Sequence, residues 1–237
     1  MPAYLSALVS GDFDVLEDQY ITRSQRKVCL QVFVEKGRLY QAQHAIQSLK
    51  KSMKWDEDTF NLEYDLDMYM IVAVDFFNMG AMENKGLNIF NSKFVLAQPD
   101  SATDEDYFNI ESIIAHEYFH NWTGNRVTCR DWFQLSLKEG LTVYRDQWFS
   151  HDMTSPLSNR IKQVNVMRSH QFAEDASAMS HPMRPDEVSE MNNVYTATVD
   201  DEGEEVSRMK QTLGGDAGMR AGMRLYVKET VCQDGRM

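Results

Sequence analysis

Residues 101–124 read SATDEDYFNIESIIAHEYFHNWTG, and this stretch decides the fold prediction. Ser101 or Thr103 can cap a helix, and three acidic residues follow, as the positive end of a helix dipole favours. Gly124 is a typical stop signal at the other end. The sequence therefore predicts one helix that begins after this cap and runs to about Thr123.

The same predicted helix carries the motif His116-Glu117-Tyr118-Phe119-His120. Four residues advance a helix by about 400°, so the two imidazoles share a face, as two ligands of one tetrahedral ion require. Glu117 lies at the edge of that face, where a carboxylate can reach a metal-bound water without being a ligand. Two ordinary surface histidines are the weaker interpretation, because chance produces this motif with odds on the order of one in a hundred.

A zinc ion also needs a third protein ligand beside an open fourth position. Glu139 lies in the next predicted helix, residues 133–149, and the connection 121–132 is long enough to reverse the chain direction. Without the motif upstream, Glu139 would be read as a solvated helix charge. Asp146, two turns on, shares the face of Glu139 and could orient a ligand histidine, the alternative being an ordinary exposed charge.

The rest of the chain has strand-like patterns before this motif and helical patterns after it. Extended runs of apolar residues cover 3–9, 27–35, 66–77 and 94–97, and helical spacing covers 38–54. After the motif, helical patterns cover 133–149, 156–172, 201–213 and 217–229, and two prolines make 179–185 an irregular connector. Strands followed by helices predict an α+β domain.

Composition excludes several classes of protein. Among 237 residues, 24 Lys and Arg against 36 Asp and Glu give a net charge of −12, the wrong sign for binding nucleic acid or an anionic membrane. No run of about 18 apolar residues could span a bilayer, and the first ten residues lack the positive region of a secretory signal. Cys29, Cys129 and Cys232 are far apart, which predicts neither a disulfide framework nor a cysteine zinc site and favours a reducing, cytoplasmic setting.

Three motifs in order carry a resemblance to a known family. Gly80-Ala81-Met82-Glu83-Asn84, then the histidine motif, then Glu139 resemble the gluzincin zinc aminopeptidases. The resemblance implies a thermolysin-like catalytic domain, a small mixed sheet followed by helices, with a β-rich domain before it and a helical one after it. Residues 1–12 would be the tail of the β-rich domain, and residues 13–237 a catalytic domain incomplete at its C-terminus.

The resemblance also implies an activity and its residues. The chain would remove the N-terminal residue of peptides with a broad, alanyl-type preference. One Zn²⁺ per chain would be held by His116, His120 and Glu139, and Glu117 would activate the zinc-bound water. A carboxylate fixed one residue's length from zinc recognises a free α-amine, and the substrate would lie against Met79, Gly80, Ala81, Met82 and Glu83, with Glu83 holding that amine.

One departure from the family pattern concerns catalysis. Asp200 stands where the family carries a catalytic tyrosine, and a carboxylate cannot donate a hydrogen bond to the developing oxyanion, a loss that typically costs about 10²–10³ in rate. Tyr195 matches a second active-site tyrosine. The alternative is therefore a catalytically impaired homologue or fragment that still binds zinc and peptide N-termini, whereas Glu83 disfavours an endopeptidase. Expected partners are peptides with a free N-terminus and flanking domains of a longer chain, without nucleic acid or membrane.

Overall fold

The computed structural model describes residues 2–188, 190, 193–231 and 234–235. The chain divides into two compact units, residues 1–121 and 122–237, which are described separately. Among the described residues, no helix combines the length and the apolar character that crossing a membrane demands.

The first unit is a mixed sheet with two long helices. Its strands and α-helices, in chain order, are β1 (Phe13–Ile21), β2 (Lys27–Glu35), α1 (Gln43–Phe60), β3 (Met68–Val74), β4 (Ala81–Met82), β5 (Leu87–Asn91) and α2 (Asp104–Phe119). Three 3-10 turns complete it: η1 (Ala3–Leu5), η2 (Leu39–Gln41) and η3 (Ser92–Phe94). Of the extended runs expected from the sequence, 27–35 and 66–77 correspond to β2 and β3, which belong to one sheet.

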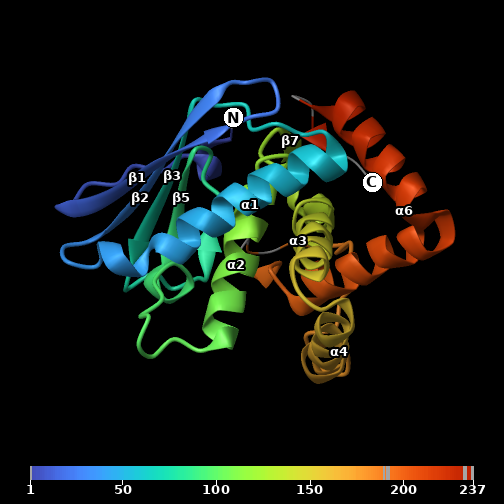
Figure 1. The fold of residues 1–237 in the computed structure, drawn as a ribbon. Coiled ribbons are helices and arrows are strands. Elements are labelled where there is room, and N and C mark those ends of the chain that lie inside the picture. Colours follow the sequence, from blue (N-terminus) through green and yellow to red (C-terminus); the bar gives the residue numbers. More distant parts are fainter. Residues whose placement is uncertain (1, 189, 191–192, 232–233, 236–237) are drawn as a thin grey trace. The chain divides into compact units, whose positions relative to one another are not determined.

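The strand order of this sheet is β1-β2-β3-β5-β4. The two parallel pairs, β2 with β3 and β3 with β5, lie between two antiparallel pairs that involve β1 and β4. Helices α1 and α2 lie side by side over one face of the sheet, as Figure 1 shows. The alternate residues of β2 that point to that face are fully buried, as are most apolar residues of α1, so the core of this unit lies between sheet and helices.

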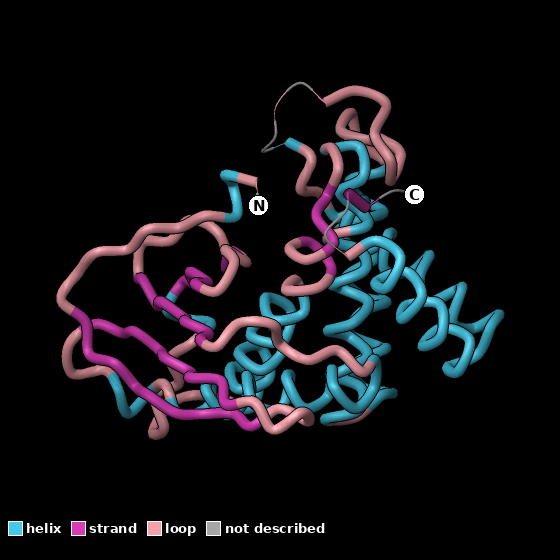
Figure 2. Tube along the Cα trace, turned by 90° about the horizontal axis from the view of Figure 1, so that it is seen from above, coloured by secondary structure: helices cyan, strands magenta, loops and turns pink. Residues whose placement is uncertain are grey.

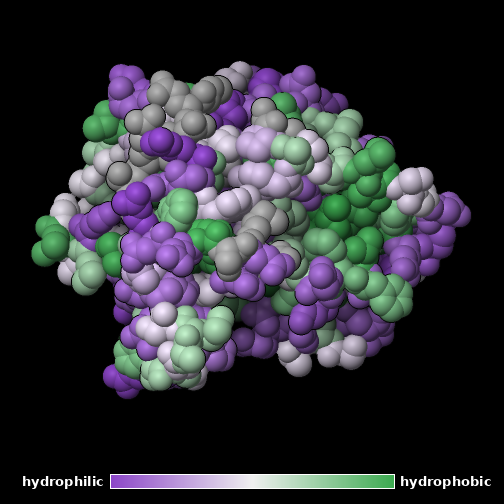
Figure 3. Space-filling model, turned by 180° about the vertical axis from the view of Figure 1, so that it is seen from behind, coloured by the Kyte–Doolittle hydropathy of each residue, from purple (hydrophilic) through white to green (hydrophobic). Residues whose placement is uncertain are grey.

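The opposite face of the sheet carries apolar side chains without a helix over them. Seen from behind, hydrophobic residues gather over the strands (Figure 3), and Val15 and Met68 are more than a third exposed. Viewed from above, the long strands of this sheet run alongside one another (Figure 2). Strand β4 is the last strand in this order, and among the described residues it pairs along one edge, with β5.

Helix α2 begins as the sequence predicts. Thr103 is the N-cap, and its hydroxyl accepts a hydrogen bond from the Asp106 backbone N–H while the Asp106 carboxylate accepts one from the Thr103 N–H, a capping box. The helix ends at Phe119, with His120 as C-cap, four residues earlier than predicted. Gly124 (φ 141°) begins no helical turn and lies in strand β6 instead.

The second unit is mainly helical. Its elements are β6 (Thr123–Gly124), β7 (Val127–Cys129), η4 (Trp132–Leu137), α3 (Glu139–Met153), α4 (Pro156–Val166), the π-helical turn η5 (Met167–Gln171), α5 (Phe172–Asp175), the π-helical turn η7 (Thr198–Glu202), α6 (Gly203–Thr230) and β8 (Asp234–Gly235). Strands β6, β7 and β8 form a small parallel sheet. Sheet followed by helices confirms the predicted α+β class.

Several predicted boundaries in the first unit are wrong for identifiable reasons. Residues 3–9 form no strand, because Pro2 starts the 3-10 turn η1. Residues 94–97 are not extended, because the Asn91 side chain accepts a hydrogen bond from Lys93 N–H and starts η3. Strand β1 was not predicted because its acidic residues Asp14, Glu17 and Asp18 interrupt the apolar pattern, and an edge strand tolerates such charges.

The helical predictions for the second unit hold with shifted limits. The helix expected over 133–149 is split into η4 and α3, because Asp131 caps the first turn. The two helices expected over 201–213 and 217–229 are one element, α6, interrupted where predicted, by Gly215 with φ 68°. Residues 179–185 are irregular, as expected. Cys29 and Cys129 are free thiols, and Cys232 lies outside the described residues.

Candidate functional site

The two histidines of the motif face each other at the end of α2. Their Nε2 atoms are 3.0 Å apart, and their rings meet edge to face with centroids 4.6 Å apart. His120 is buried and His116 is half-buried. The spacing of four residues thus brings both imidazoles to one point, as predicted.

This pair of nitrogens fits a metal ion. A tetrahedral zinc with Zn–N distances of about 2.0–2.1 Å needs its two nitrogens roughly 3.3 Å apart, close to the 3.0 Å between these two Nε2 atoms. Neutral imidazole nitrogens are borderline donors that zinc prefers. The donor set at the end of α2 therefore suits zinc.

Two carboxylates lie beside His120. Glu83, Glu117 and His120 each offer one ligand atom, and these three atoms lie within 4.8 Å of one another. The carboxylates come from different elements, Glu83 from the loop after β4 and Glu117 from α2, and both side chains are buried. The structure thus places together three residues for which the family resemblance implies amine binding, proton transfer and metal binding.

The phenol of Tyr69, which lies near Glu117, is uncharged. Burial, with the nearby Tyr64 and Glu117, raises the pKa of Tyr69 well above its ordinary value. Tyr69 on β3 therefore stays a neutral phenol at any physiological pH.

The strand that precedes Glu83 is short and lies at the sheet edge. In β4, Ala81 pairs with Phe90 and Met82 with Ile89, and the Gly80 carbonyl accepts a hydrogen bond from Asn91 N–H at 2.9 Å. Because β5 occupies only one edge of β4, the other edge can pair with an extended peptide. Met79, predicted to line the first side-chain pocket, is 45% exposed at the start of this segment.

The second unit contains the remaining predicted residues. Glu139 begins α3, and its carboxylate forms an ion pair with the ammonium of Lys138, both side chains being buried. The Lys138 ammonium also lies over the ring of Tyr195, 5.4 Å from its centroid. Within this unit, therefore, the structure brings Glu139 and Tyr195 together around Lys138, a residue that the sequence analysis did not single out.

Helix α3 approaches the turn that carries Asp200 unusually closely. A Cβ at Gly140 would lie 2.9 Å from the Cα of Gly203 and 3.2 Å from the Val199 carbonyl oxygen. Only glycine leaves room for such a contact between backbones. Gly140 thereby fixes the start of α3, and with it Glu139, against the turn η7.

Asp200 lies half-buried in η7, and its backbone N–H donates to the Thr196 carbonyl. The carboxylate of Glu174 holds the start of this turn, because it accepts hydrogen bonds from the Thr198 N–H at 2.9 Å and the Thr198 hydroxyl at 2.7 Å. No sequence pattern pointed to Glu174, because it lies far from Thr198 in the sequence and belongs to no motif. The position of Asp200 is thus set by a side chain from α5.

Asp146 lies near Asp201, a second aspartate of the turn η7. Burial, together with the charge of Asp146, raises the pKa of Asp201 to about 6. Asp146 is itself buried, seven residues after Glu139 on α3 and therefore on the same helical face. Its predicted role in orienting a ligand histidine stays a prediction, as does the role of Glu139 as third ligand, since the histidines belong to the first unit.

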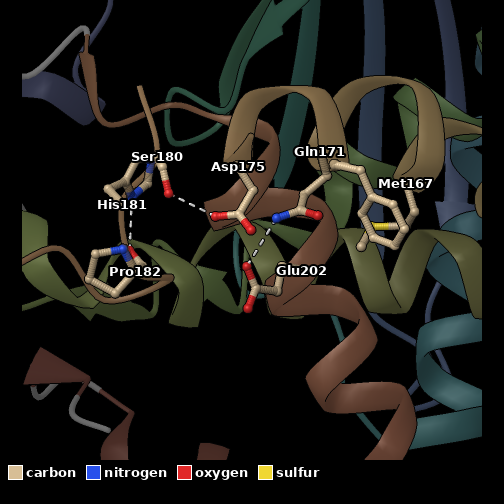
Figure 4. A pocket seen from close by; sticks show the side chains of 8 residues that line it. Met167, Gln171, Asp175, Ser180, His181, Pro182 and Glu202 are labelled. Carbon is tan, nitrogen blue, oxygen red and sulfur yellow. Dashed lines mark hydrogen bonds between the residues drawn. The ribbon is translucent and has the colours of Figure 1, made fainter. Parts of the chain in front are cut away.

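A cavity of about 520 Å³ opens beside the end of η7 (Figure 4). The Gln171 amide donates to the Glu202 carboxylate at 3.3 Å, and the Ser180 hydroxyl donates to Asp175 at 2.9 Å. Burial and the charge of Asp175 raise the pKa of Glu202. No sequence motif pointed to this cavity, whose lining also includes Met167, Phe172, His181 and Pro182.

Comparisons with known proteins agree with these motifs. The Peptidase family M1 domain matches residues 44–235. The chain is 67% identical to Aminopeptidase N of Haemophilus influenzae over 98% of its own length and 27% of that protein, and 68% identical to Aminopeptidase N of Escherichia coli over 95% and 26%. It therefore spans about a quarter of the length of these relatives.

A solved structure matches the fold as well. The crystal structure of Legionella pneumophila aminopeptidase A in complex with aspartic acid superimposes with a TM-score of 0.88 at 31% sequence identity. The match covers 98% of this chain and 26% of that one. The motifs, the fold and a domain match that extends over most of the chain confirm the resemblance: the chain belongs to peptidase family M1.

Proposed function

We propose that this chain carries the catalytic centre of a zinc-dependent aminopeptidase, which hydrolyses the N-terminal residue of peptides with a broad, alanyl-type preference. The observation that carries the proposal is the group of Glu83, Glu117 and His120 within 4.8 Å. It sets an amine-binding carboxylate beside a base and a metal ligand. Relatives named Aminopeptidase N at 57–68% identity support the same activity.

The metal would be one zinc ion held by His116, His120 and Glu139. Zinc, when bound, would polarise the scissile carbonyl and lower the pKa of a water. Glu117 lies near this position, so its carboxylate would take the proton of the attacking water and pass it to the leaving amine. The zinc dependence of the family and the fit of the histidine pair support this assignment.

The substrate would lie along the open edge of β4. Gly80 and Ala81 would pair with its backbone, while the Glu83 carboxylate would bind the α-ammonium group. A buried carboxylate rejects a blocked, uncharged N-terminus because its own charge would then lack a partner. This requirement selects removal of one terminal residue over internal cleavage.

A second candidate function rests on Asp200. If no group replaces the tyrosine hydroxyl of the family, the chain would bind zinc and peptide N-termini but turn over slowly. Tyr195, whose ring lies beneath the Lys138 ammonium in the same unit, is the alternative donor that the family pattern offers. The free thiols of Cys29 and Cys129 suit a reducing, cytoplasmic setting.

Metal removal tests the proposal. Dialysis against a chelator should abolish hydrolysis of L-alanyl anilide, and about one equivalent of zinc per chain should restore it. Zinc content by atomic absorption, measured on the same samples, should rise in step with the rate. Hydrolysis that survives complete removal of the metal would contradict the proposal.

A further inference from the structure

Three polar side chains of the first unit form a closed hydrogen-bonded group. The Lys85 ammonium donates to Asp65 Oδ1 at 2.6 Å and also to Asn121 Oδ1, and the Asn121 amide donates to the same Asp65 oxygen at 3.0 Å. The three residues come from three separate segments of the chain. We name them the Lys85 group.

The Lys85 group joins the two parts of the proposed centre. Lys85 is two residues beyond Glu83, and its backbone N–H donates to the Leu5 carbonyl at 3.0 Å. Asn121 follows His120 directly, at the end of α2. The side chains of the Lys85 group therefore connect the Glu83 segment with the end of α2 that carries the histidines, and they hold each other in place.

The environment of the group keeps its geometry rigid. The side chains of Lys85 and Asp65 are only 13% and 18% exposed, and the ammonium also lies over the ring of the buried Tyr64, 5.6 Å from its centroid. Exposed ion pairs exchange partners with water and do not hold a side chain in one geometry. A pair with little exposure and a third hydrogen-bonded partner holds a single arrangement.

We infer that Lys85 is a positioning residue, which sets the Glu83 carboxylate at the correct distance from the metal-binding end of α2. The inference rests on the proposed function and deepens it, because it names how the site recognises a free α-amine. A displacement of about 1 Å in such a site can cost about 10²-fold in kcat/KM. Since Glu83 contacts the amine before and during the reaction alike, its displacement should act chiefly on KM.

The test compares three variants of the full chain loaded with zinc. Lys85→Met removes the ammonium, Lys85→Arg keeps a cation, and Lys54→Met removes an exposed lysine of α1 that pairs with Asp58. Lys85→Met should raise KM for L-alanyl anilide about tenfold or more, change kcat less than about threefold and keep the zinc content. Lys85→Arg should recover most of the affinity, and Lys54→Met should match the parent chain.

Asp65→Asn gives a second route if Lys85→Met does not fold. The substitution keeps the shape of the acceptor but removes its charge, so KM should rise in the same direction by a smaller factor. An unchanged KM in a folded Lys85→Met or Asp65→Asn protein would overturn the inference. A lowered melting temperature with unchanged KM would overturn it equally, because the group would then be merely structural.

Hydrogen exchange separates failure of this inference from failure of the proposed function. A parent chain that hydrolyses no anilide refutes the proposed function. In that case the exchange rate of the backbone amides of residues 81–85 tests the positioning role of Lys85. Faster exchange of these amides in zinc-loaded Lys85→Met, with unchanged exchange in α2, supports a positioning role. Equal exchange in variant and parent would overturn it.

Discussion

At the scale of single residues, the end of α2 explains why histidines four positions apart meet. One helical turn places the Nε2 atoms of His116 and His120 3.0 Å apart. Glu117, the residue after His116, is buried beside Glu83. Neither carboxylate needs to bind the metal for both to act near it. Their separate roles can be tested one substitution at a time.

Glu117→Gln tests the proposed base. The amide has the size of the carboxylate but cannot accept a proton, so kcat for L-alanyl anilide should fall by about 10²–10⁴-fold. Zinc content should stay at about one equivalent, since Glu117 is not a proposed ligand. Stopped assays on protein of known zinc content check this, and a turnover equal to that of the parent would refute the assignment.

Asp200→Tyr tests the departure from the family pattern. A phenol at this half-buried position could donate a hydrogen bond to the oxyanion, so kcat should rise by up to about 10²-fold. Asp200→Asn is the matched control, because it removes the charge without adding the hydroxyl, and should give a smaller rise. No gain in a folded Asp200→Tyr protein would show that another group stabilises the oxyanion.

Asp201 gives a pH-dependent prediction. Its folded pKa of about 6 exceeds the ordinary aspartate value of 3.8, so the folded state binds its proton more tightly. This stabilisation is complete below about pH 4 and is lost as pH rises through about 6. Asp201→Asn should therefore be more stable than the parent above pH 6, by about 1–3 kcal/mol after allowance for solvent screening.

Urea unfolding at pH 4 and at pH 7.5 checks the prediction for Asp201. The charges that face this side chain come from Asp146, Glu174, Glu205 and His170, and all stay in place in the variant. The stability difference between variant and parent should be present at pH 7.5 and nearly vanish at pH 4. An equal difference at both pH values would contradict the titration of Asp201.

At the scale of elements, the contact between α3 and η7 depends on Gly140. Gly140→Ala would place a methyl group 2.9 Å from the backbone of Gly203. Overpacking of this kind costs about 1–3 kcal/mol, and thermal unfolding should show a lower melting temperature. Gly222→Ala is the control, because nothing lies within 4 Å of a Cβ there, and should be neutral or stabilising. Equal effects of both substitutions would contradict the role of this contact.

The sequence predicted which elements exist better than where they end. Local signals with a direct physical interpretation appear where expected, such as the helix cap at Thr103 and the interruption between residues 201–213 and 217–229. Strand β1 was not predicted, because a charged edge strand is recognised mainly by its pairing with β2. The turn η3 was missed although its signal is local, the Asn91 side chain that accepts from Lys93 N–H. Helix α1 extends to Phe60, beyond the predicted end near Lys54, because its αL cap, Asn61, lies further on.

The candidate site was predictable where residues share one motif. The histidine pair and Glu117 follow from helical spacing alone, and the approach of Glu83 to Glu117 was implied only by the family resemblance. Residues that act through long-range contacts were missed, among them Glu174, which holds η7, and Lys85. Such side chains carry no pattern in sequence because their partners lie 20 or more positions away.

At the scale of the whole molecule, the chain spans about a quarter of the length of its Aminopeptidase N relatives. Both units contribute residues that the family pattern assigns to one centre: the histidines and Glu83 from the first, Glu139 and the position of Asp200 from the second. The proposed function therefore implies that the molecule would cleave peptides only next to a free α-amine.

A parallel assay of L-alanyl anilide and N-acetyl-L-alanyl anilide with the zinc-loaded chain tests this claim most directly. The buried Glu83 carboxylate should favour the free amine, so kcat/KM for L-alanyl anilide should exceed that for the acetylated substrate by at least about 10³-fold. Glu83→Gln should remove most of this preference. Hydrolysis of both substrates at similar rates, or of the blocked one alone, would contradict the account.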